Sequence, residues 1–235
     1  MSFNWVAPGT FLMGSPATEC GRSVSERQFR ATISRGFWLS KYPVTQAQWI
    51  TIIGSNPSGF QDQEEFYDLP VENVNWFDAC AFCEQLGTVI AIELPGNWRF
   101  RLPTQVEWEY ACRAGTATKY FFGEADSQIG CFAWYAANSM DRTHPVGQKQ
   151  GNGWGFYDMY GNVWEWCLDG PDEYPLSDAI DWIGPTDSDN KVIRGGSYGV
   201  KVEEGDLRSA CRGYCDAYAK RPWFGFRVAL AEAQE

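Results

Sequence analysis

The tryptophans of this chain, together with the residues beside them, constrain its fold more than any other feature. The chain has 12 tryptophans among 235 residues, and several adjoin Gly or Asn, as in Gly153–Gly155 and Asn162–Trp166. Glycine and asparagine permit sharp backbone turns, and a buried indole ring supplies a large apolar contact beneath such a turn. The pattern predicts long loops that are ordered over packed aromatic rings.

Regular helices are predicted at three places, all in the first half of the chain. Thr45–Ile53 begins at a capping Thr and ends before a glycine, Asn75–Leu86 begins at Asn75, and Thr104–Ala114 begins with a capping box. After residue 116, turn residues recur nearly every ten positions, and Lys191–Arg194 and Gly225–Leu230 are predicted to be strands. Because no repeat or linker is visible, we expect one α+β domain over residues 1–235, with an irregular antiparallel sheet and much loop.

The charge balance excludes several classes of partner. The formal net charge is −11 and no run of Lys or Arg occurs, so nucleic acid is not expected to bind. No stretch of about 18 apolar residues is present, so we expect no transmembrane segment in this chain. The first residues also lack the charged and apolar regions of a secretion signal.

The cysteines do not follow the spacing of a metal site. Cys80 and Cys83 form a C-x-x-C pair, but Trp76, Ala79 and Leu86 continue the same helical spacing, which predicts a buried helix face. Zinc binding or redox chemistry is the alternative, although no second ligand pair follows. The eight cysteines are spread along the chain and leave the redox compartment open. His144 is the only histidine, which weakens any scheme that requires several imidazoles.

A series of motifs follows one order from about residue 6 to residue 230. They are Phe11–Gly14, Lys41–Thr45, Arg101–Thr104, Glu107–Ala111, Gly155–Asp158, Gly161–Trp166, Arg194–Ser197, Arg208–Ala210 and Gly225–Val228. The chain resembles the formylglycine-generating-enzyme, or sulfatase-modifying-factor, family, in which these motifs follow one another in the same order. The resemblance implies a C-type-lectin-like fold with few helices.

The catalytic chemistry of that family does not carry over to the matching positions. The resemblance places the catalytic cysteine pair just after Gly195–Tyr198, where residues 199–207 contain no cysteine. Cys211 and Cys215 lie beyond that place in a gapless match to Gly225–Arg227. We therefore expect a protein that is not an enzyme and requires no cofactor. A cysteine-dependent oxidoreductase that uses these two thiols is one alternative, and a structural scaffold protein is another.

The family also includes the variable proteins of diversity-generating retroelements, which the end of this chain resembles. In those proteins adenine-directed mutagenesis rewrites the segment that corresponds to residues 195–228 here. Randomising the adenines of Asn codons cannot produce Lys, Glu, Gln, Met or Trp, and Cys211–Ala219 contains none of these. The resemblance implies a ligand-binding protein of receptor or adhesin type, at the cell surface or outside the cell. Its ligand is an unknown protein or cell-surface molecule, and we expect a monomer.

The predicted ligand-binding residues all lie in this C-terminal segment. They are Val200, Val202, Cys211, Gly213, Tyr214, Cys215, Asp216, Tyr218, Ala219, Trp223 and Phe224. Tyrosine and tryptophan provide a large contact area at low entropic cost, as in antibody loops, so an exposed aromatic patch is expected here. For Trp223 and Phe224 the alternative is a place in the core beside the strand at Gly225.

The resemblance implies further roles for charged residues. A structural calcium ion would take the side chains of Asp158 and Glu165 and the carbonyl groups of Gly161 and Val163, which are the oxygen ligands that calcium prefers. The alternative is that Glu165 accepts hydrogen bonds from backbone N–H groups or from an arginine such as Arg194. The motif residues Arg101, Glu107, Arg194, Arg208 and Arg227 are predicted to be buried and paired with one another or with other charges.

Overall fold

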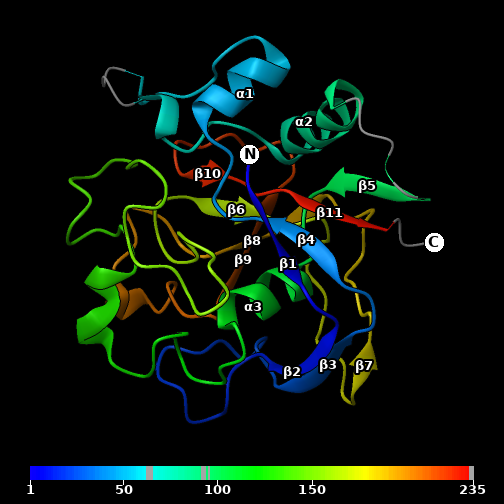
Figure 1. Cartoon of the computed structure of the whole chain (residues 1–235). Coiled ribbons are helices and arrows are strands. Elements are labelled where there is room, and N and C mark those ends of the chain that lie inside the picture. The colour runs from blue at the N-terminus through cyan, green and yellow to red at the C-terminus, as the bar shows by residue number, and fades with distance from the viewer. Residues whose placement is uncertain (62–65, 91–93, 95, 233–235) are drawn as a thin grey trace.

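The computed structural model describes residues 1–61, 66–90, 94 and 96–232. Its α-helices are α1 (Gln46–Ile53), α2 (Trp76–Val89) and α3 (Gln105–Arg113), and short 3-10 turns form η1 (Phe66–Asp68), η2 (Asp126–Cys131) and η3 (Val202–Glu204). Figure 1 shows α1 and α2 together on one side of the strands, with α3 among the strands and loops. The α+β class with much loop is confirmed.

Each predicted helix begins directly after the capping residue that the sequence indicated. The side chains of Thr45, Asn75 and Thr104 accept a hydrogen bond from the backbone N–H three residues later, and the side chain at that later position bonds back to the cap. These reciprocal bonds satisfy N–H groups that the first helical turn leaves free. Helix α2 continues three residues beyond its predicted end, to Val89.

The strands form three small sheets. One contains β1 (Phe3–Val6), β4 (Phe37–Ser40), β11 (Ala229–Glu232) and β5 (Trp98–Arg101) in that order. The second has the order β10 (Phe224–Gly225), β6 (Trp164–Trp166), β8 (Asn190–Arg194) and β9 (Arg212–Asp216). The third joins β2 (Gly9–Met13), β3 (Phe29–Ile33) and β7 (Ala179–Ile180). Pairing is antiparallel except between β10 and β6 and between β3 and β7.

The strand predicted at Gly225–Leu230 is divided between two sheets. β10 ends at Gly225 and β11 begins at Ala229, and the three residues between them cross from one sheet to the other. During the crossing the Phe226 carbonyl accepts from the Val44 N–H, and the Val228 N–H donates to Ser40 Oγ. The prediction of one strand was wrong because the apolar pattern does not reveal a change of bonding partner.

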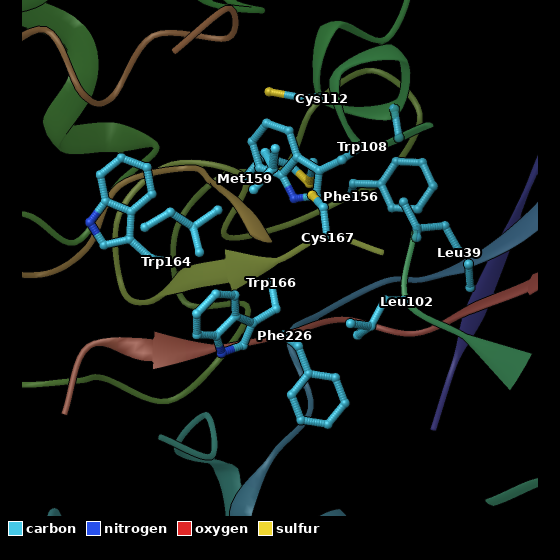
Figure 2. Packing of buried hydrophobic residues seen from close by; sticks show 14 of the residues in the cluster. Leu39, Leu102, Trp108, Cys112, Phe156, Met159, Trp164, Trp166, Cys167 and Phe226 are labelled. Carbon is cyan, nitrogen blue, oxygen red and sulfur yellow. The ribbon is translucent and has the colours of Figure 1, made fainter. Parts of the chain in front are cut away.

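Helix α3 is buried on every side and forms the centre of the core. All of its residues from Gln105 to Arg113 are buried, and Trp108 is fully enclosed. Figure 2 shows the Trp108 ring close to Phe156 and Cys167, with Trp166 and Phe226 continuing the packing below. Of the tryptophans in the predicted pattern, Trp164 and Trp166 are buried in the core and Trp154 is half-buried against it.

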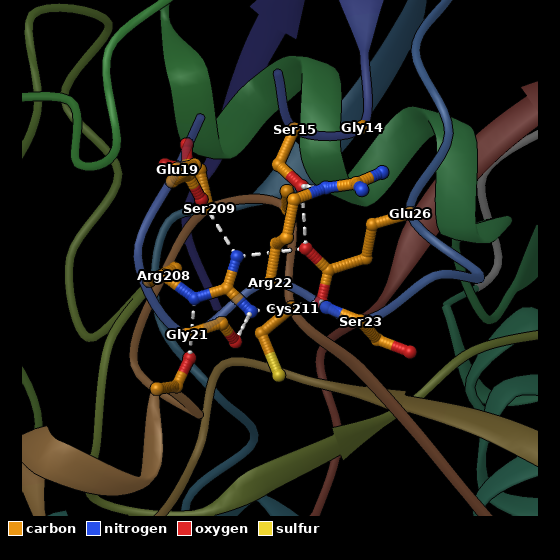
Figure 3. A network of polar contacts seen from close by, with 12 residues as sticks. Gly14, Ser15, Glu19, Gly21, Arg22, Ser23, Glu26, Arg208, Ser209 and Cys211 are labelled. Atoms are coloured by element: carbon orange, nitrogen blue, oxygen red, sulfur yellow. Dashed lines mark hydrogen bonds and ion pairs between the residues drawn. The ribbon is translucent and has the colours of Figure 1, made fainter. Parts of the chain in front are cut away.

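The predicted framework charges are buried and paired. Arg101 bonds Glu107, Arg194 bonds Glu109, and Arg208 bonds Glu26 and Glu19. Figure 3 shows the Arg208 guanidinium reaching Glu26 and the carbonyl of Gly21. Because Arg208 lies about 180 residues from Glu26 in sequence, the pair ties the C-terminal segment to the loop that follows β2. These arginines therefore hold the framework on which the C-terminal segment lies.

None of the helices in the described part of the chain has both the length and the apolar character needed to cross a membrane.

Candidate ligand-binding face

The C-terminal segment places β9 at the edge of its sheet. β9 pairs with β8 along its whole length, with Tyr214 opposite Val192 and Cys215 opposite Lys191, and it has no strand on its other side among the described residues. Side chains alternate between the two faces of a strand, so Tyr214 and Cys215 point to opposite faces. At the edge of a sheet, side chains from both faces can border the same open surface.

Aromatic side chains are exposed around this edge. Tyr214 is 64% exposed and Tyr218 is 72% exposed, while Asp216 is also on the surface. Trp223 is 39% exposed, but it precedes β10, at the other edge of the sheet. The exposure expected for Tyr214 and Tyr218 is therefore confirmed, and their role in binding remains a prediction. Tyr218 lies just beyond β9, where its backbone N–H donates to the Asp216 carboxylate and holds the turn.

The first turn of α2 extends the aromatic surface. The ring centroids of Phe77 and Tyr218 are 4.6 Å apart, and Phe77 is 42% exposed. The turn is fixed against the C-terminal segment, because the Trp76 N–H donates to the Ala217 carbonyl and Lys220 pairs with Asp78 at 2.7 Å. Sequence reasoning missed Phe77 because it considered only residues near the C-terminus. The signal was available: adjacent residues on a helix diverge by about 100°, so Trp76 and Phe77 cannot both face the core.

A buried cation supports this surface from below. Lys191 is 2% exposed, and its Nζ lies 4.2 Å from the centroid of the Trp76 ring. Burial lowers the pKa of Lys191. The contact positions Trp76, and through it the α2 turn that carries Phe77, against the β8–β9 pair.

Three of the predicted binding residues are buried, which corrects the expectation that they are exposed. Val200, Cys211 and Phe224 are at most 7% exposed and belong to the core cluster. Phe224 packs edge-on against Trp166, and the Val200 carbonyl accepts from the Ala136 N–H. Cys211 lies beside the Arg208–Glu26 network in Figure 3. For Phe224 the alternative of a place in the core is confirmed. For Val200 and Cys211 the expectation was wrong, because proximity in sequence to an exposed segment does not specify which side chains point inward.

The remaining predicted residues lie at the border of the surface. Val202, Gly213, Cys215 and Ala219 are half-buried. Gly213 has close neighbours: a Cβ added there would lie 3.0 Å from Ile193. The exposed part of the predicted site at β9 therefore consists of Tyr214, Asp216 and Tyr218.

The loop that flanks β9 is acidic. Residues 172–189 contain Asp172, Glu173, Asp178, Asp181, Asp187 and Asp189 and no Lys or Arg. Two of these residues contact the ends of the strand through their backbone carbonyls, since Asp172 accepts from Arg212 Nη2 and Asp189 accepts from the Ala217 N–H. The side chains of Asp172 and Asp189 are exposed, so they add negative charge beside Tyr214.

The Glu165 side chain does not fit the implied calcium site. One of its oxygens accepts from Arg227 Nη2 at 2.7 Å, and the other accepts from Arg227 Nε at 2.6 Å and Trp108 Nε1 at 2.7 Å. The alternative that an arginine satisfies Glu165 is confirmed, but the arginine is Arg227 and not Arg194, which bonds Glu109. Asp158 is buried, which raises its pKa to about 6, and it accepts from the Gly147 N–H. A calcium ion held by the Asp158 side chain and the carbonyl groups of Gly161 and Val163 remains a prediction, with Glu165 no longer among its ligands.

The cysteines are not arranged as a cluster in the described part of the chain. No group of three or more His, Cys, Asp or Glu side chains there could hold a metal ion. Cys83 is buried in α2 and Cys80 is half-buried, as the helical spacing predicted, and burial raises the pKa of both thiols. Burial also raises the pKa of Cys211, whose thiol lies 3.5 Å from Asp206 Oδ1. A thiol held protonated is a poor nucleophile and a poor metal ligand.

Comparisons with known proteins support the fold described above. The sulfatase-modifying factor enzyme 1-like domain family matches residues 2–232. A chaperone protein LppX from Paenibacillus barcinonensis is 30% identical, covering 83% of this chain and 80% of that protein. A formylglycine-generating enzyme from Streptomyces coelicolor is 34% identical over 64% of this chain, which spans half the length of that enzyme. The structure of Treponema denticola variable protein 1 superimposes with a TM-score of 0.86 and 27% identity, covering 97% of this chain and 94% of that one.

Proposed function

This chain belongs to the sulfatase-modifying factor enzyme 1-like domain family, and within that family we propose that it is a non-catalytic ligand-binding protein. Its binding surface, called here the β9 face, consists of Tyr214, Asp216, Tyr218 and Phe77. The observation that carries the proposal is the exposure of Tyr214 and Tyr218 on a strand and turn that a buried charge network holds in place. Rigid exposed aromatic residues are typical of protein-binding surfaces.

The similarity to Treponema denticola variable protein 1 supports this proposal. The superposition with that structure covers 97% of this chain. By analogy with a variable protein, residues 195–228 form a diversified segment on a constant frame. Arg208 lies within this segment and Arg194 directly precedes it, and their partners Glu26 and Glu109 lie outside it. Side chains at Tyr214 and Tyr218 could then change without the loss of a buried pair.

A peptide selection tests the binding function. Twelve-residue peptides displayed on phage are selected on the protein, and the enriched peptides are measured against the Tyr214→Ala/Tyr218→Ala double variant. Trp38→Ala is the matched control, because Trp38 is an exposed aromatic residue of another sheet. We expect the double variant to lose binding at least tenfold and the control to retain it. Equal binding to all three proteins would reject the β9 face.

Formylglycine generation is the second candidate, favoured by the 34% identity to the Streptomyces coelicolor enzyme. The buried Cys211 argues against it, since burial raises the pKa of its thiol and the side chain lies beside the Arg208 network. The purified protein, with and without copper, should leave a cysteine-containing sulfatase-type peptide unchanged in mass. Conversion that disappears in Cys215→Ser would identify a cysteine-dependent oxidoreductase and overturn the non-catalytic proposal.

A further inference from the structure

The main-chain groups at the centre of β9 point away from the sheet. The Val192 N–H donates to the Asp169 carbonyl, and the Val192 carbonyl accepts from the Cys167 N–H. Both bonds lie on the side of β8 that faces β6. Val192 is opposite Tyr214, and three positions farther along the strands the Ala217 N–H donates to the Asp189 carbonyl, which makes Asp189 and Ala217 a bonded pair. In an antiparallel pair, bonded and non-bonded positions alternate, so the Tyr214 N–H and C=O are directed outward.

These outward groups have no partner in the part of the chain that the structure describes. No hydrogen bond is formed there by the backbone N–H or C=O of Tyr214. The neighbouring outward positions are Arg212 and Asp216, of which Asp216 accepts from the Ala219 N–H at the end of the strand. An exposed edge of this kind can accept a further strand from another chain.

Side chains of the β9 face border the edge on both sides. The Phe77–Tyr218 pair lies next to the end of the strand, where Ala217 bonds Trp76, and Tyr214 stands on the face opposite Cys215. An extended segment that paired with β9 would therefore contact aromatic rings while its backbone bonded the edge. In such pairing the main-chain bonds supply affinity and the side-chain contacts supply specificity.

The charge around the edge indicates the chemistry of the added segment. Exposed carboxylates of Asp172, Asp189 and Asp216 lie near the two ends and on the strand itself. The nearby cations are engaged: Arg212 lies 3.9 Å from the Tyr174 ring centroid, and Lys220 pairs with Asp78. With a net charge of −11 on the whole chain, the edge favours Lys and Arg over Asp and Glu in its partner.

We infer that the β9 edge binds an extended, basic polypeptide segment by adding it as a new strand beside Tyr214. This inference rests on the proposed binding function and specifies its partner. The contact requires the Tyr214 main chain, whereas binding by exposed side chains alone requires only the tyrosine rings. The two modes predict different responses to a proline at position 214.

The decisive comparison is Tyr214→Pro against Tyr214→Ala. Both remove the ring, but only proline removes the outward N–H and obstructs strand addition, and proline is tolerated at an edge position whose N–H faces solvent. The probe is a ten-residue peptide of alternating Lys and Val, measured by fluorescence anisotropy. We expect Tyr214→Pro to bind it at least tenfold more weakly than Tyr214→Ala, with similar melting temperatures. Equal affinities would reject strand addition.

Two further probes keep the test independent of how the proline variant folds. The same Lys–Val peptide with alternate backbone nitrogens methylated should bind the unmodified protein at least tenfold more weakly, and a Glu–Val peptide should also bind more weakly. Equal binding of the methylated peptide would reject strand addition, and equal binding of the Glu–Val peptide would reject the basic partner. If the phage-selected peptides still depend on Tyr214 and Tyr218, the proposed function survives either result.

Discussion

Arg227 and Glu165 form a bidentate ion pair in which neither side chain is exposed to solvent. Their bonds of 2.6 and 2.7 Å join the crossing between β10 and β11 to the strand β6. The Trp108 indole of the central helix also donates to Glu165. One carboxylate thus connects three parts of the fold, which explains why it is turned toward the core.

Substitution of Glu165 by Gln should destabilise the protein strongly. The change leaves the Arg227 charge buried without a counter-ion, and breaking a buried pair from one side typically costs about 3–5 kcal/mol. Urea denaturation measures the loss. The control is Asp178→Asn, which removes the exposed partner of Arg30 at 3.7 Å and should change stability by less than about 0.5 kcal/mol. Equal small effects of the two changes would contradict the structural role of Glu165.

The Glu72 carboxylate should make stability depend on pH. Burial raises the pKa of Glu72 to about 7; one oxygen accepts from the N–H groups of Gly59 and Phe60, and the other has no hydrogen-bond partner within the described structure. A carboxyl group whose folded-state pKa is raised contributes stability below about pH 4.5 that is lost as the pH rises through about 7. The Gln variant, which stays neutral, should lack this loss.

Glu72→Gln should therefore be more stable than the unmodified protein at pH 8, by about 1–3 kcal/mol. The difference should shrink steadily as the pH falls toward 5. Chemical denaturation at several pH values measures it, and because Asp158 titrates equally in both proteins, its contribution cancels. A difference that is constant with pH would show that Glu72 is already ionised at pH 5 in the folded state.

The Phe77–Tyr218 contact should give a measurable coupling. Aromatic pairs at this separation contribute about 0.5–1.5 kcal/mol beyond the area they bury, and partial exposure of both rings places this pair toward the lower end of that range. A double-mutant cycle with Phe77→Ala and Tyr218→Ala measures the coupling in thermal denaturation. Phe77→Ala with Tyr214→Ala is the control cycle and should be additive. Additivity in both cycles would show that Phe77 does not organise the β9 face.

The sequence predicted those parts of the fold that depend on local bonds or on matched motifs. Thr45, Asn75 and Thr104 mark helix starts because a capping side chain bonds its own neighbours. Arg101 and Arg227 could be predicted as buried because a charge among large apolar residues requires a partner. The identity of the partner for Arg227 could not be predicted, since Glu165 is 62 residues away.

Errors in the candidate site arose where side-chain direction depends on distant packing. Cys211 and Tyr214 are three residues apart, yet one lies beside the buried Arg208 and the other lies at an open edge. That difference follows from where β9 begins and from its register with β8, which no local pattern in the segment specifies. Phe77 was missed for the same reason, because α2 approaches Tyr218 only in the folded chain.

Truncations at the β9 face should lower stability much less than truncations in the core. Tyr214→Ala and Cys215→Ala remove side chains that are exposed or half-buried, and exposed substitutions usually change stability by less than about 0.5 kcal/mol. Tyr218→Ala should cost about 0.5 kcal/mol more, because it also loses the Phe77 contact. Trp166→Ala should cost about 3–5 kcal/mol, because it leaves a cavity beside Phe224. The Trp166 indole also donates to the Val74 carbonyl, which would lose its partner. Thermal denaturation of the four variants compares them directly. If Tyr214→Ala and Tyr218→Ala lowered the melting temperature as much as Trp166→Ala, those tyrosines would support the core, and the β9 face could not vary independently of the frame.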